Sequence, residues 1–360
     1  RNGLWNCLMA LPASGAISLA NIQTEFTGSN PIGMNEYYRG GAYVTANNTS
    51  VPTSGQIAVG NFYGAVREFY LTLASDVQNA NISTLATAAG WDGTAPLIVT
   101  VNVGVWLWSD SVATAGLIIP SISSSVTIHN YGKIIGRGSN GGAGSSYAAC
   151  VAVAGGPAIS NAASTVSLTN YSGAFIAGGG GGGGGAVQDP GGSASWAGGG
   201  GGAGGGVGGS ARTIYNYVNV AGGAGGAIGS SGANGGDSGR DNSKGLGGGS
   251  GGGGGKSWSA AAAGSGGGGG RILPGSGGAG QIGGWPSANG GNGGSAGSAG
   301  ASAYGDDNIY VAGGGGGGWG AAGGSGRNFG GYNAGGAGGA AISGTAVTLT
   351  NSGTIYGTTA

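Results

Sequence analysis

Side chains suited to acid–base or metal chemistry are scarce in this chain. Its 360 residues include one histidine, His129, and two cysteines, Cys7 and Cys150. The cysteines form no CxxC or other metal-binding spacing, so we expect neither a metal site nor a disulfide framework. His129 lies in an alternating pattern typical of a strand, and we interpret it as a structural or surface residue. Asp306 and Asp307 are adjacent and could contact a cation, but we interpret them as part of an exposed turn.

Two positioned carboxylates could cleave a glycosidic bond, as polysaccharide-degrading enzymes do. The acids of the glycine-rich part of the chain fall in short segments that resemble connections: Asp189, Asp237, Asp241, Asp306 and Asp307. Strings of the form GxGxxG follow from the glycine content alone and indicate no nucleotide site without a strand and a helix around them. We therefore predict no catalytic residues, no metal and no cofactor.

The composition excludes further classes of function. Glycine accounts for 98 residues, about four times its usual share, and eleven basic residues balance eleven acidic ones. A net charge of zero with so few cations excludes the basic footprint that nucleic-acid binding needs. No run of about 18 apolar residues predicts a transmembrane helix. Residues 178–339 hold 73 of the glycines, so the chain divides into a β-type part and a glycine block.

Strand patterns precede the glycine block. Residues 66–75 and 96–108 alternate or are rich in β-branched residues, which predicts strands. In the second of these we expect the valines from Val99 to Val105, Val103 included, to face one side. Residues 79–91 predict a short helix that ends before Gly90.

A repeat surrounds the glycine block. Residues 126–136 are matched by 166–178 and again by 347–357, each with an alternating strand, an Asn and Gly turn, and a second short strand. This theme predicts either a β-hairpin or a rung of a β-solenoid. Two copies come before the block and one follows it, so we expect them to clamp its two ends together.

The glycine block has two interpretations. Polyglycine in isolation is flexible, which favours a disordered linker. Against this, nine glycine-dense runs alternate with segments that carry aromatic residues, which a linker does not need. Packed side by side as left-handed extended helices of three residues per turn, the runs could pair every peptide group with a neighbour, provided that glycine allows close approach. We predict this polyglycine II bundle.

The segments between runs then become connections at the ends of a rigid bundle, with their aromatic and charged side chains exposed. Such side chains suit recognition, because they give contact area at low entropic cost. The candidate binding residues are Trp196, Arg212, Tyr215, Tyr217, Arg240, Lys244, Trp258, Arg271, Trp285, Tyr304, Asp306, Asp307, Tyr310, Trp319, Phe329 and Tyr332. The candidate scaffold glycines are Gly178, Gly180, Gly200, Gly252, Gly268 and Gly315.

The N-terminal segment contains a repeat of its own. Residues 14–22, SGAISLANI, are echoed by residues 54–62, SGQIAVGNF. Residues 21–27 predict one or two helical turns with Asn21 as N-cap. Met9 has the context of a natural start, so residues 1–8 are interpreted as an extension.

Two sets of sequence segments resemble known protein families. SGAISLANIQTEFTGSNPIGMNEYYRGGAYV and VPTSGQIAVGNFYGA resemble a short module of tailed-phage structural proteins. REFYLTL, NISTLATAAGWDGTAPLIVTVNVGVWLWSDS, VTIHNYGKIIGRGSNGGAG and AFIAGGGGGGGG resemble the receptor-recognition adhesins at the tip of T-even-type long tail fibres. The resemblance implies polyglycine II helices, distal loops that bind outer-membrane receptors, and a virion location at the tail tip. The N-terminal module differs from the attachment domain usual in that family.

We therefore expect a mainly β chain with irregular parts, in four units. These are a tail-docking module at 1–65, a β domain at 66–177, the glycine-rich receptor-binding domain at 178–340 and a closing β segment at 341–360. The expected partners are a bacterial outer-membrane protein or surface polysaccharide, and a tail fibre or other tail protein through residues 12–65. The alternatives are a structural connector of the tail and a polysaccharide-degrading tail spike.

Overall fold

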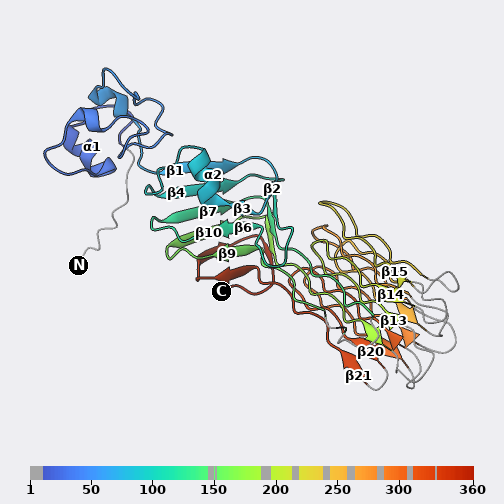
Figure 1. Cartoon of the computed structure of the whole chain (residues 1–360). Coiled ribbons are helices and arrows are strands. Elements are labelled where there is room, and N and C mark those ends of the chain that lie inside the picture. The colour runs from blue at the N-terminus through green and yellow to red at the C-terminus, as the bar shows by residue number, and fades with distance from the viewer. Residues whose placement is uncertain are drawn as a thin grey trace.

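The computed structural model describes residues 11–144, 150, 152–187, 196–212, 219–237, 244–257, 264–281, 288–305, 311–328 and 331–360. The molecule is elongated and mainly β, with a small N-terminal module, a stack of parallel strands and a bundle of extended glycine-rich segments in a row (Figure 1). None of the helices in these ranges combines the length and apolar character that crossing a membrane requires.

The N-terminal module folds around its own repeat. Helix α1 (Leu19–Phe26) and two short 3-10 helices, η1 (Met34–Glu36) and η2 (Val59–Phe62), enclose a core of apolar side chains. The N-cap of α1 is Ser18, whose hydroxyl accepts from the Asn21 backbone N–H at 3.2 Å. The prediction of Asn21 as N-cap was therefore wrong: its amide oxygen instead accepts from the Ser18 N–H at 2.9 Å, the reciprocal bond of a capping box.

The stack of strands consists of three parallel sheets, which together we call the solenoid. Sheet one contains β1 (Phe69–Leu73), β4 (Leu97–Val101), β7 (Val126–Asn130), β10 (Val166–Asn170) and β23 (Thr348–Asn351). Sheet two contains β2 (Val77–Gln78), β5 (Trp106–Trp108), β8 (Lys133–Ile135), β11 (Phe175–Ala177) and β24 (Thr354–Tyr356). Sheet three contains β3 (Ala80–Asn81), β6 (Leu117–Ile119), β9 (Ile159–Asn161) and β22 (Ile342–Gly344).

The chain visits the three sheets in turn, so each pass forms one rung. Alternate residues of the strands point inward and form one buried apolar core. The predicted repeat copies stack in parallel register, with Leu168 opposite both Ile128 and Leu349. Parallel pairing excludes the hairpin and establishes the solenoid alternative, and β10 pairs directly with β23 across the whole glycine block.

Two details of the strands differ from expectation. The continuous strand over 96–108 is interrupted, since β4 ends at Val101 and Gly104 adopts a positive φ of 82°. Val103 consequently lies in the turn and is 82% exposed, rather than facing the core with Val99 and Val101. The predicted helix over 79–91 forms as α2 (Ile82–Ala88), with Asn81 as N-cap.

Asparagines at the end of the sheet-one strands form a ladder inside the turns. Asn130 donates from Nδ2 to Asn170 Oδ1 at 2.8 Å, and Asn170 donates in the same way to Asn351 Oδ1 at 2.8 Å. Asn130 and Asn170 are fully buried, so these bonds satisfy amides that water cannot reach. The ladder joins the rungs before the glycine block to the rung after it.

The glycine block is inserted within a single rung, between β11 and β22. A shorter excursion, residues 136–158, leaves the rung below at the same place, between β8 and β9. The two stretches lie side by side in the bundle, because Gly199 and Gly202 donate to Gly142 and Ser139 of the shorter one, at 3.0 and 2.9 Å. The bundle is therefore built from both excursions.

Hydrogen bonds in the bundle follow a period of three residues. Along the run from Gly199, each third N–H returns to the same neighbouring segment. Gly200 and Ala203 donate to Gly314 and Gly317, and Gly201 and Gly204 donate to Gly267 and Gly270, all at 2.9 Å. Each of these runs is thus surrounded by segments on several sides and bonded to all of them.

Short antiparallel pairs end the runs on the side away from the solenoid. They are β12 (Ala186–Val187) with β13 (Trp196–Ala197), β14 (Ala211–Arg212) with β15 (Asn219–Val220), and β17 (Ala288–Asn289) with β18 (Tyr304–Gly305). A four-stranded sheet joins β16 (Lys256–Ser257), β19 (Val311–Ala312), β20 (Gly326–Asn328) and β21 (Gly331–Asn333).

Candidate functional site

The end of the bundle farthest from the N-terminal module is the first candidate site, and we call it the distal end. The labelled strands β13, β14, β15, β20 and β21 gather there, at the opposite end of the molecule from α1 (Figure 1). The strand pairs carry the chain out of one glycine run and back into the next. The described strand pairs therefore lie together at this end (Figure 1).

Two tyrosines of the candidate set are exposed at the distal end. Tyr332 on β21 is 62% exposed, and the Arg327 guanidinium lies 4.8 Å from its ring centre. Tyr304 on β18 is 58% exposed. A large aromatic ring that remains in contact with water on a rigid strand pair is suited to bind a partner.

Trp196 on β13 and Arg212 on β14 lie against each other on neighbouring strand pairs. Trp196 is 5% exposed, and the Arg212 guanidinium lies 5.4 Å from its ring centre. The expectation that Trp196 is exposed was wrong, because its ring packs where β13 adjoins β14. In this position, Trp196 supports the strand pairs that surround it.

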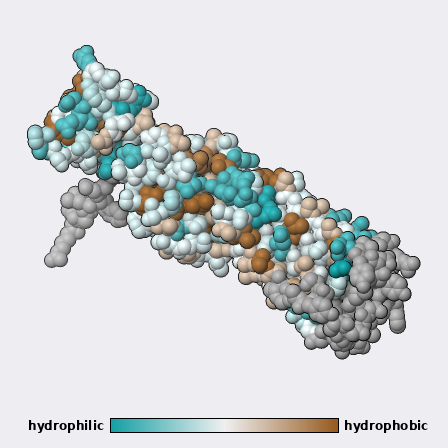
Figure 2. Space-filling view, in the orientation of Figure 1, coloured by the Kyte–Doolittle hydropathy of each residue, from teal (hydrophilic) through white to brown (hydrophobic). Residues whose placement is uncertain are grey.

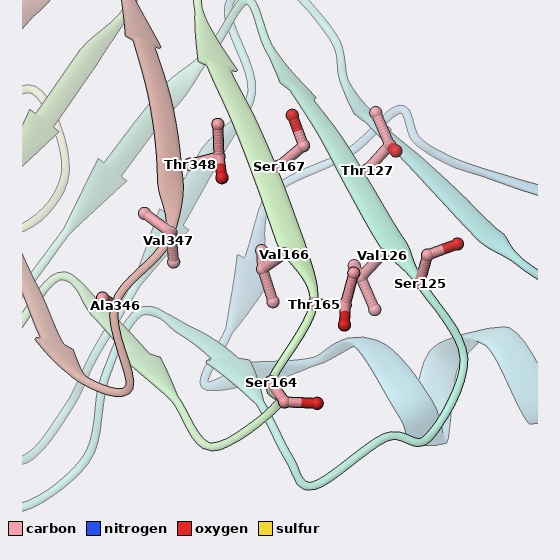
Figure 3. Close-up of a pocket in the computed structure, with 10 residues that line it drawn as sticks. All are labelled: Ser125, Val126, Thr127, Ser164, Thr165, Val166, Ser167, Ala346, Val347 and Thr348. Carbon is pink, nitrogen blue, oxygen red and sulfur yellow. The ribbon is translucent and has the colours of Figure 1, made fainter. Parts of the chain in front are cut away.

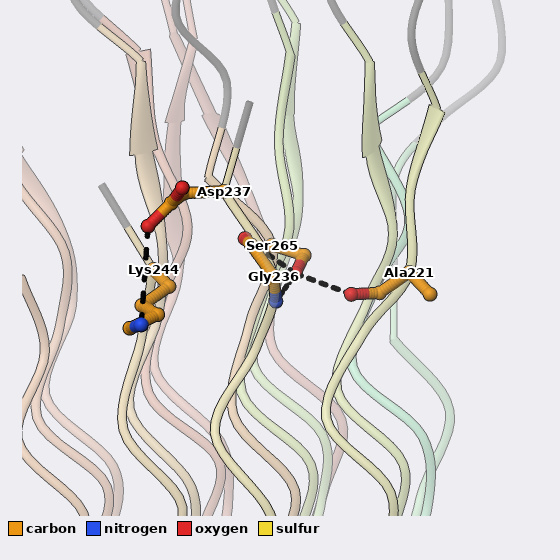
Figure 4. A network of polar contacts seen from close by, with 5 residues as sticks. All are labelled: Ala221, Gly236, Asp237, Lys244 and Ser265. Atoms are coloured by element: carbon orange, nitrogen blue, oxygen red, sulfur yellow. Dashed lines mark hydrogen bonds and ion pairs between the residues drawn. The ribbon is translucent and has the colours of Figure 1, made fainter. Parts of the chain in front are cut away.

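A polar network fixes three glycine runs just below the distal end (Figure 4). The fully buried Ser265 hydroxyl donates to Ala221 O at 2.6 Å and accepts from Gly236 N at 2.7 Å. Beside it, Lys244 Nζ lies 3.9 Å from Asp237 Oδ2. Lys244 is thus held by an acid at the base of a connection. Ser265 was not among the predicted residues, although a single serine inside a glycine run is a visible signal.

Nine candidate residues fall outside the described residues, and their positions stay predictions: Tyr215, Tyr217, Arg240, Trp258, Trp285, Asp306, Asp307, Tyr310 and Phe329. Of the acids considered for glycoside cleavage, Asp189 and Asp241 lie outside the described residues as well. Within the ranges that the structure covers, no three His, Cys, Asp or Glu side chains cluster as a metal site would require.

Trp319 and Arg271 lie at the other end of the bundle, against the solenoid. Trp319 is fully buried and donates from Nε1 to Ile272 O at 2.8 Å. It packs with Trp106, Ile135 and Ala177 of sheet two, and we call this cluster the apolar joint. The expectation of exposure was wrong for Trp319, because its connection turns toward the solenoid rather than away from it.

Arg271 is 6% exposed beside the joint. Its guanidinium lies 4.6 Å from the Trp108 ring centre, and Nε donates to Gly204 O at 3.1 Å. Burial, with the nearby Arg137 charge, lowers the pKa of Arg271 to about 10, so the side chain stays protonated at neutral pH. Arg271 fastens the bundle to the solenoid, and exposure was wrongly expected for it too.

The six candidate scaffold glycines have no room for a side chain. A methyl group added to Gly200 or Gly315 would lie 1.9 Å from a neighbouring carbonyl oxygen. At Gly178, Gly180, Gly252 and Gly268 the corresponding distances are between 2.0 and 2.2 Å. These contacts are impossible for a real methyl group, so the spacing of the bundle depends on glycine at each position.

A hollow of about 350 Å³ lies on the outer face of the solenoid (Figure 3). It is lined at the starts of β7, β10 and β23 by hydroxyl and apolar side chains, among them Thr127, Ser167 and Thr348. Hydroxyl groups exchange hydrogen bonds but do not titrate near neutral pH. The hollow is therefore suited to contact and not to acid–base chemistry.

A stiff scaffold that presents exposed aromatic side chains at one end is an arrangement suited to recognition. A family model described as phage tail fibre adhesin Gp38 matches residues 68–248, half of the chain. The chain therefore belongs to the Gp38 family of phage tail fibre adhesins, which confirms the resemblance seen in its sequence. It is an extracellular component of the virion tail.

A solved structure is also similar, the gp37-gp38 adhesin tip complex of the bacteriophage S16 long tail fiber. The similarity covers 88% of this chain and 91% of that chain, with 20% sequence identity and a TM-score of 0.43. No curated protein matches the chain.

Proposed function

We propose that this adhesin sits at the tip of a long tail fibre and binds a receptor on the host cell surface through its distal end. The observation that supports this most is the exposure of Tyr304 and Tyr332 on strand pairs whose bases are locked into the glycine lattice. Rigid support lowers the ordering cost of binding, so a few aromatic contacts suffice for affinity.

The proposed contact set separates by position. Tyr304, Tyr332 and Arg327 supply surface at the distal end, together with the nine candidates outside the described residues. Trp196 and Arg212 support that surface, and Lys244 is held at its base. Arg271 and Trp319 contribute only indirectly, by fixing the bundle to the solenoid.

We also propose that the glycine runs are polyglycine II helices. The three-residue period of the lattice supports this, because a helix with three residues per turn points successive N–H groups to three sides. Glycine positions such as Gly200, where a side chain cannot fit, support it too. Only a backbone of this kind lets each run bond to several neighbours at once.

The chain is proposed to work as four units, with boundaries at residues 65, 177 and 340. The unit at 1–65 docks on the tail fibre or another tail protein, since it has its own core around Phe26, Tyr37 and Phe62. The solenoid carries the bundle, and the last unit closes it. The receptor is an outer-membrane protein or a surface polysaccharide.

Exchange of the connections tests the receptor site. Residues 210–221, 256–263 and 301–312 are replaced in the phage by Gly-Ser segments of equal length, and adsorption to host cells is counted. We expect adsorption to fall at least tenfold. As a control, Val103→Ser, at a residue that is 82% exposed in a turn of the solenoid, should leave adsorption near the starting level.

The outcomes separate the alternatives. Unchanged adsorption after all three exchanges would contradict the receptor site; if deletion of residues 12–65 then prevents assembly, the chain is a connector. Purified protein is also mixed with host cells that possess or lack surface polysaccharide. Binding lost with the polysaccharide identifies it as receptor, binding retained identifies a protein, and clearing of purified polysaccharide would reveal a degrading spike.

A further inference from the structure

A second, smaller hollow lies where the solenoid meets the bundle. It has a volume of about 190 Å³ and is lined by Asp110 and Val112, which follow β5, and by Arg137, Asn140 and Val153 of the shorter excursion. Figure 2 shows a hydrophilic patch over the middle of the molecule, where β2 is labelled in Figure 1. The hollow is far from the distal end and belongs to no site described above.

The Arg137 guanidinium is the main feature of this hollow. Arg137 is half-buried, and within the described ranges it forms neither an ion pair nor a hydrogen bond through its side chain. Burial lowers the pKa of the Arg137 guanidinium below its ordinary value, while the side chain remains charged at neutral pH. A charged guanidinium with five donors and no acceptor is costly to bury, so it favours an anion from outside.

A second cation faces Arg137 across one glycine. A methyl group on Gly205 would lie 2.9 Å from Arg137 Nη1 and 3.0 Å from Arg271 Nε, so both guanidinium groups rest against the same Cα. The carboxylate that acts on both is Asp110, which is not within ion-pair distance of either. Arg271 does not line the hollow, but together with Arg137 it outweighs the single negative charge of Asp110, so the surroundings of the hollow carry a net positive charge.

Asp110 is held in place by amides of the neighbouring strand region. Gln78 Nε2 donates to Oδ2 at 2.6 Å, and Asn79 Nδ2 donates to Oδ1 at 2.8 Å. A carboxylate has about four lone-pair sites, so Asp110 keeps acceptor capacity for hydroxyl groups. Val112 and Val153, 37% and 60% exposed, add an apolar wall.

From this arrangement we infer that the hollow binds an acidic saccharide. The carboxylate or phosphate group of one sugar residue pairs with Arg137, its hydroxyl groups donate to Asp110, and the C–H face of its ring lies against the valines. The volume is below the range of about 300–1,000 Å³ for ordinary ligand pockets, which fits one sugar residue rather than a chain. This site is independent of the proposed distal receptor site and would give the adhesin a second contact with a charged cell surface.

Calorimetric titration of the purified full chain tests the inference. The probes are glucuronate, glucose 6-phosphate and glucose. We expect one or both anions to bind with a Kd of roughly 1 mM, about −4 kcal/mol, and glucose to show no binding. Saturation by glucuronate alone identifies a carboxylate as the charged group, and saturation by the phosphate ester identifies a phosphate.

Three variants make the result specific to the hollow. Arg137→Gln should weaken anion binding at least tenfold, whereas Arg67→Gln, the same charge change beside the N-terminal module, should leave it unchanged. Asp110→Asn should tighten binding of inorganic phosphate several-fold, because it removes the opposing charge. Thermal melting establishes that each variant is folded. Absence of anion binding, equal binding of glucose, or an equal effect of R137Q and R67Q would overturn the inference.

Discussion

At the scale of single residues, the bundle depends on the absence of side chains at its glycine positions. Gly200 donates to Gly314 O at 2.9 Å while its Cα faces Gly252 O so closely that no methyl group fits. Stability here comes from backbone bonds worth about 1 kcal/mol each, which act together only if the runs keep their spacing. A single side chain in the wrong place therefore affects several bonds.

Gly200→Ala is expected to lower the free energy of unfolding by about 3 kcal/mol, through overpacking and broken lattice bonds. Gly331→Ala is the control, because a methyl group there meets no atom within 4 Å. Denaturant unfolding of both variants gives the comparison. Equal stabilities would show that the lattice tolerates side chains.

Glu25 gives the N-terminal module a dependence on pH. Glu25 is 6% exposed, its carboxylate accepts from Arg67 N at 2.9 Å, and desolvation raises its pKa above 4.5. The charged form is thus disfavoured in the folded state, so this stabilising contribution is complete below pH 4.5 and is lost as the pH rises through the raised pKa.

Glu25→Gln should therefore raise the melting temperature of the module at pH 7, and its advantage should disappear below about pH 4.5. The amide oxygen still accepts from Arg67 N. Glu36→Gln is the control, since Glu36 is exposed. Melting curves recorded between about pH 4 and pH 7 test whether the advantage of the variant depends on pH in this way. An E25Q variant that is less stable than the parent at pH 7 would refute the expectation.

Single residues were the hardest feature to predict from the sequence. Tyr332 and Trp319 are both aromatic residues directly preceded by glycine, yet Tyr332 is 62% exposed and Trp319 is fully buried. The difference arises because alternate connections lie at opposite ends of the bundle. Local composition does not reveal which end a connection occupies, as Arg271 also illustrates.

At the scale of elements, the solenoid depends on stacking of equivalent positions. Asn170 both accepts from Asn130 and donates to Asn351, so it links three rungs. Asn351 ends the ladder and is exposed. Removal of the same amide is therefore expected to lower the free energy of unfolding by different amounts at different rungs.

Asn170→Ala should lower the free energy of unfolding by about 2 to 4 kcal/mol, because it leaves buried amide and carbonyl groups without partners. Asn351→Ala, at the exposed end of the ladder, should cost about 1 kcal/mol or less. Chemical denaturation monitored by circular dichroism measures both. A cost at Asn351 equal to that at Asn170 would remove the ladder as a source of stability.

Elements were predictable wherever one periodicity determined them. The repeat around Asn130, Asn170 and Asn351 is legible because stacked rungs require the same residue at the same place. The break after Val101 was missed, since Gly104 interrupts an apolar run that otherwise continues. The insertion of the block within a rung was also beyond prediction, because β22 carries little of the repeat.

Beyond the N-terminal module, the molecule is a solenoid with two excursions that leave and return at one point. Gly156 N donates to Arg137 O, and Gly339 N donates to Gly179 O, each at 2.7 Å. The chain therefore re-enters each rung beside the point where it left, so the rungs could be connected without the bundle. The attachment of the bundle relies on these crossings and on the apolar joint.

A variant that lacks residues 138–155 and 180–338, with two glycines at each junction, should keep the folded solenoid. We expect a β-type circular dichroism spectrum and cooperative melting, at a lower temperature because Trp106 and Ile135 lose their cover. Binding to host cells should be abolished. Loss of cooperative melting would show that the solenoid needs the bundle to fold.

The Asn170–Asn351 bond joins residues 181 positions apart, and this separation has a consequence for the order of folding. The run at Gly200 takes partners from residues 139–142 on one side and 314–317 on another, so no run can be completed from its own neighbourhood. Contacts between distant positions make folding slow. During synthesis the early glycine runs therefore wait without their final partners until the segment around residues 314–317 has emerged.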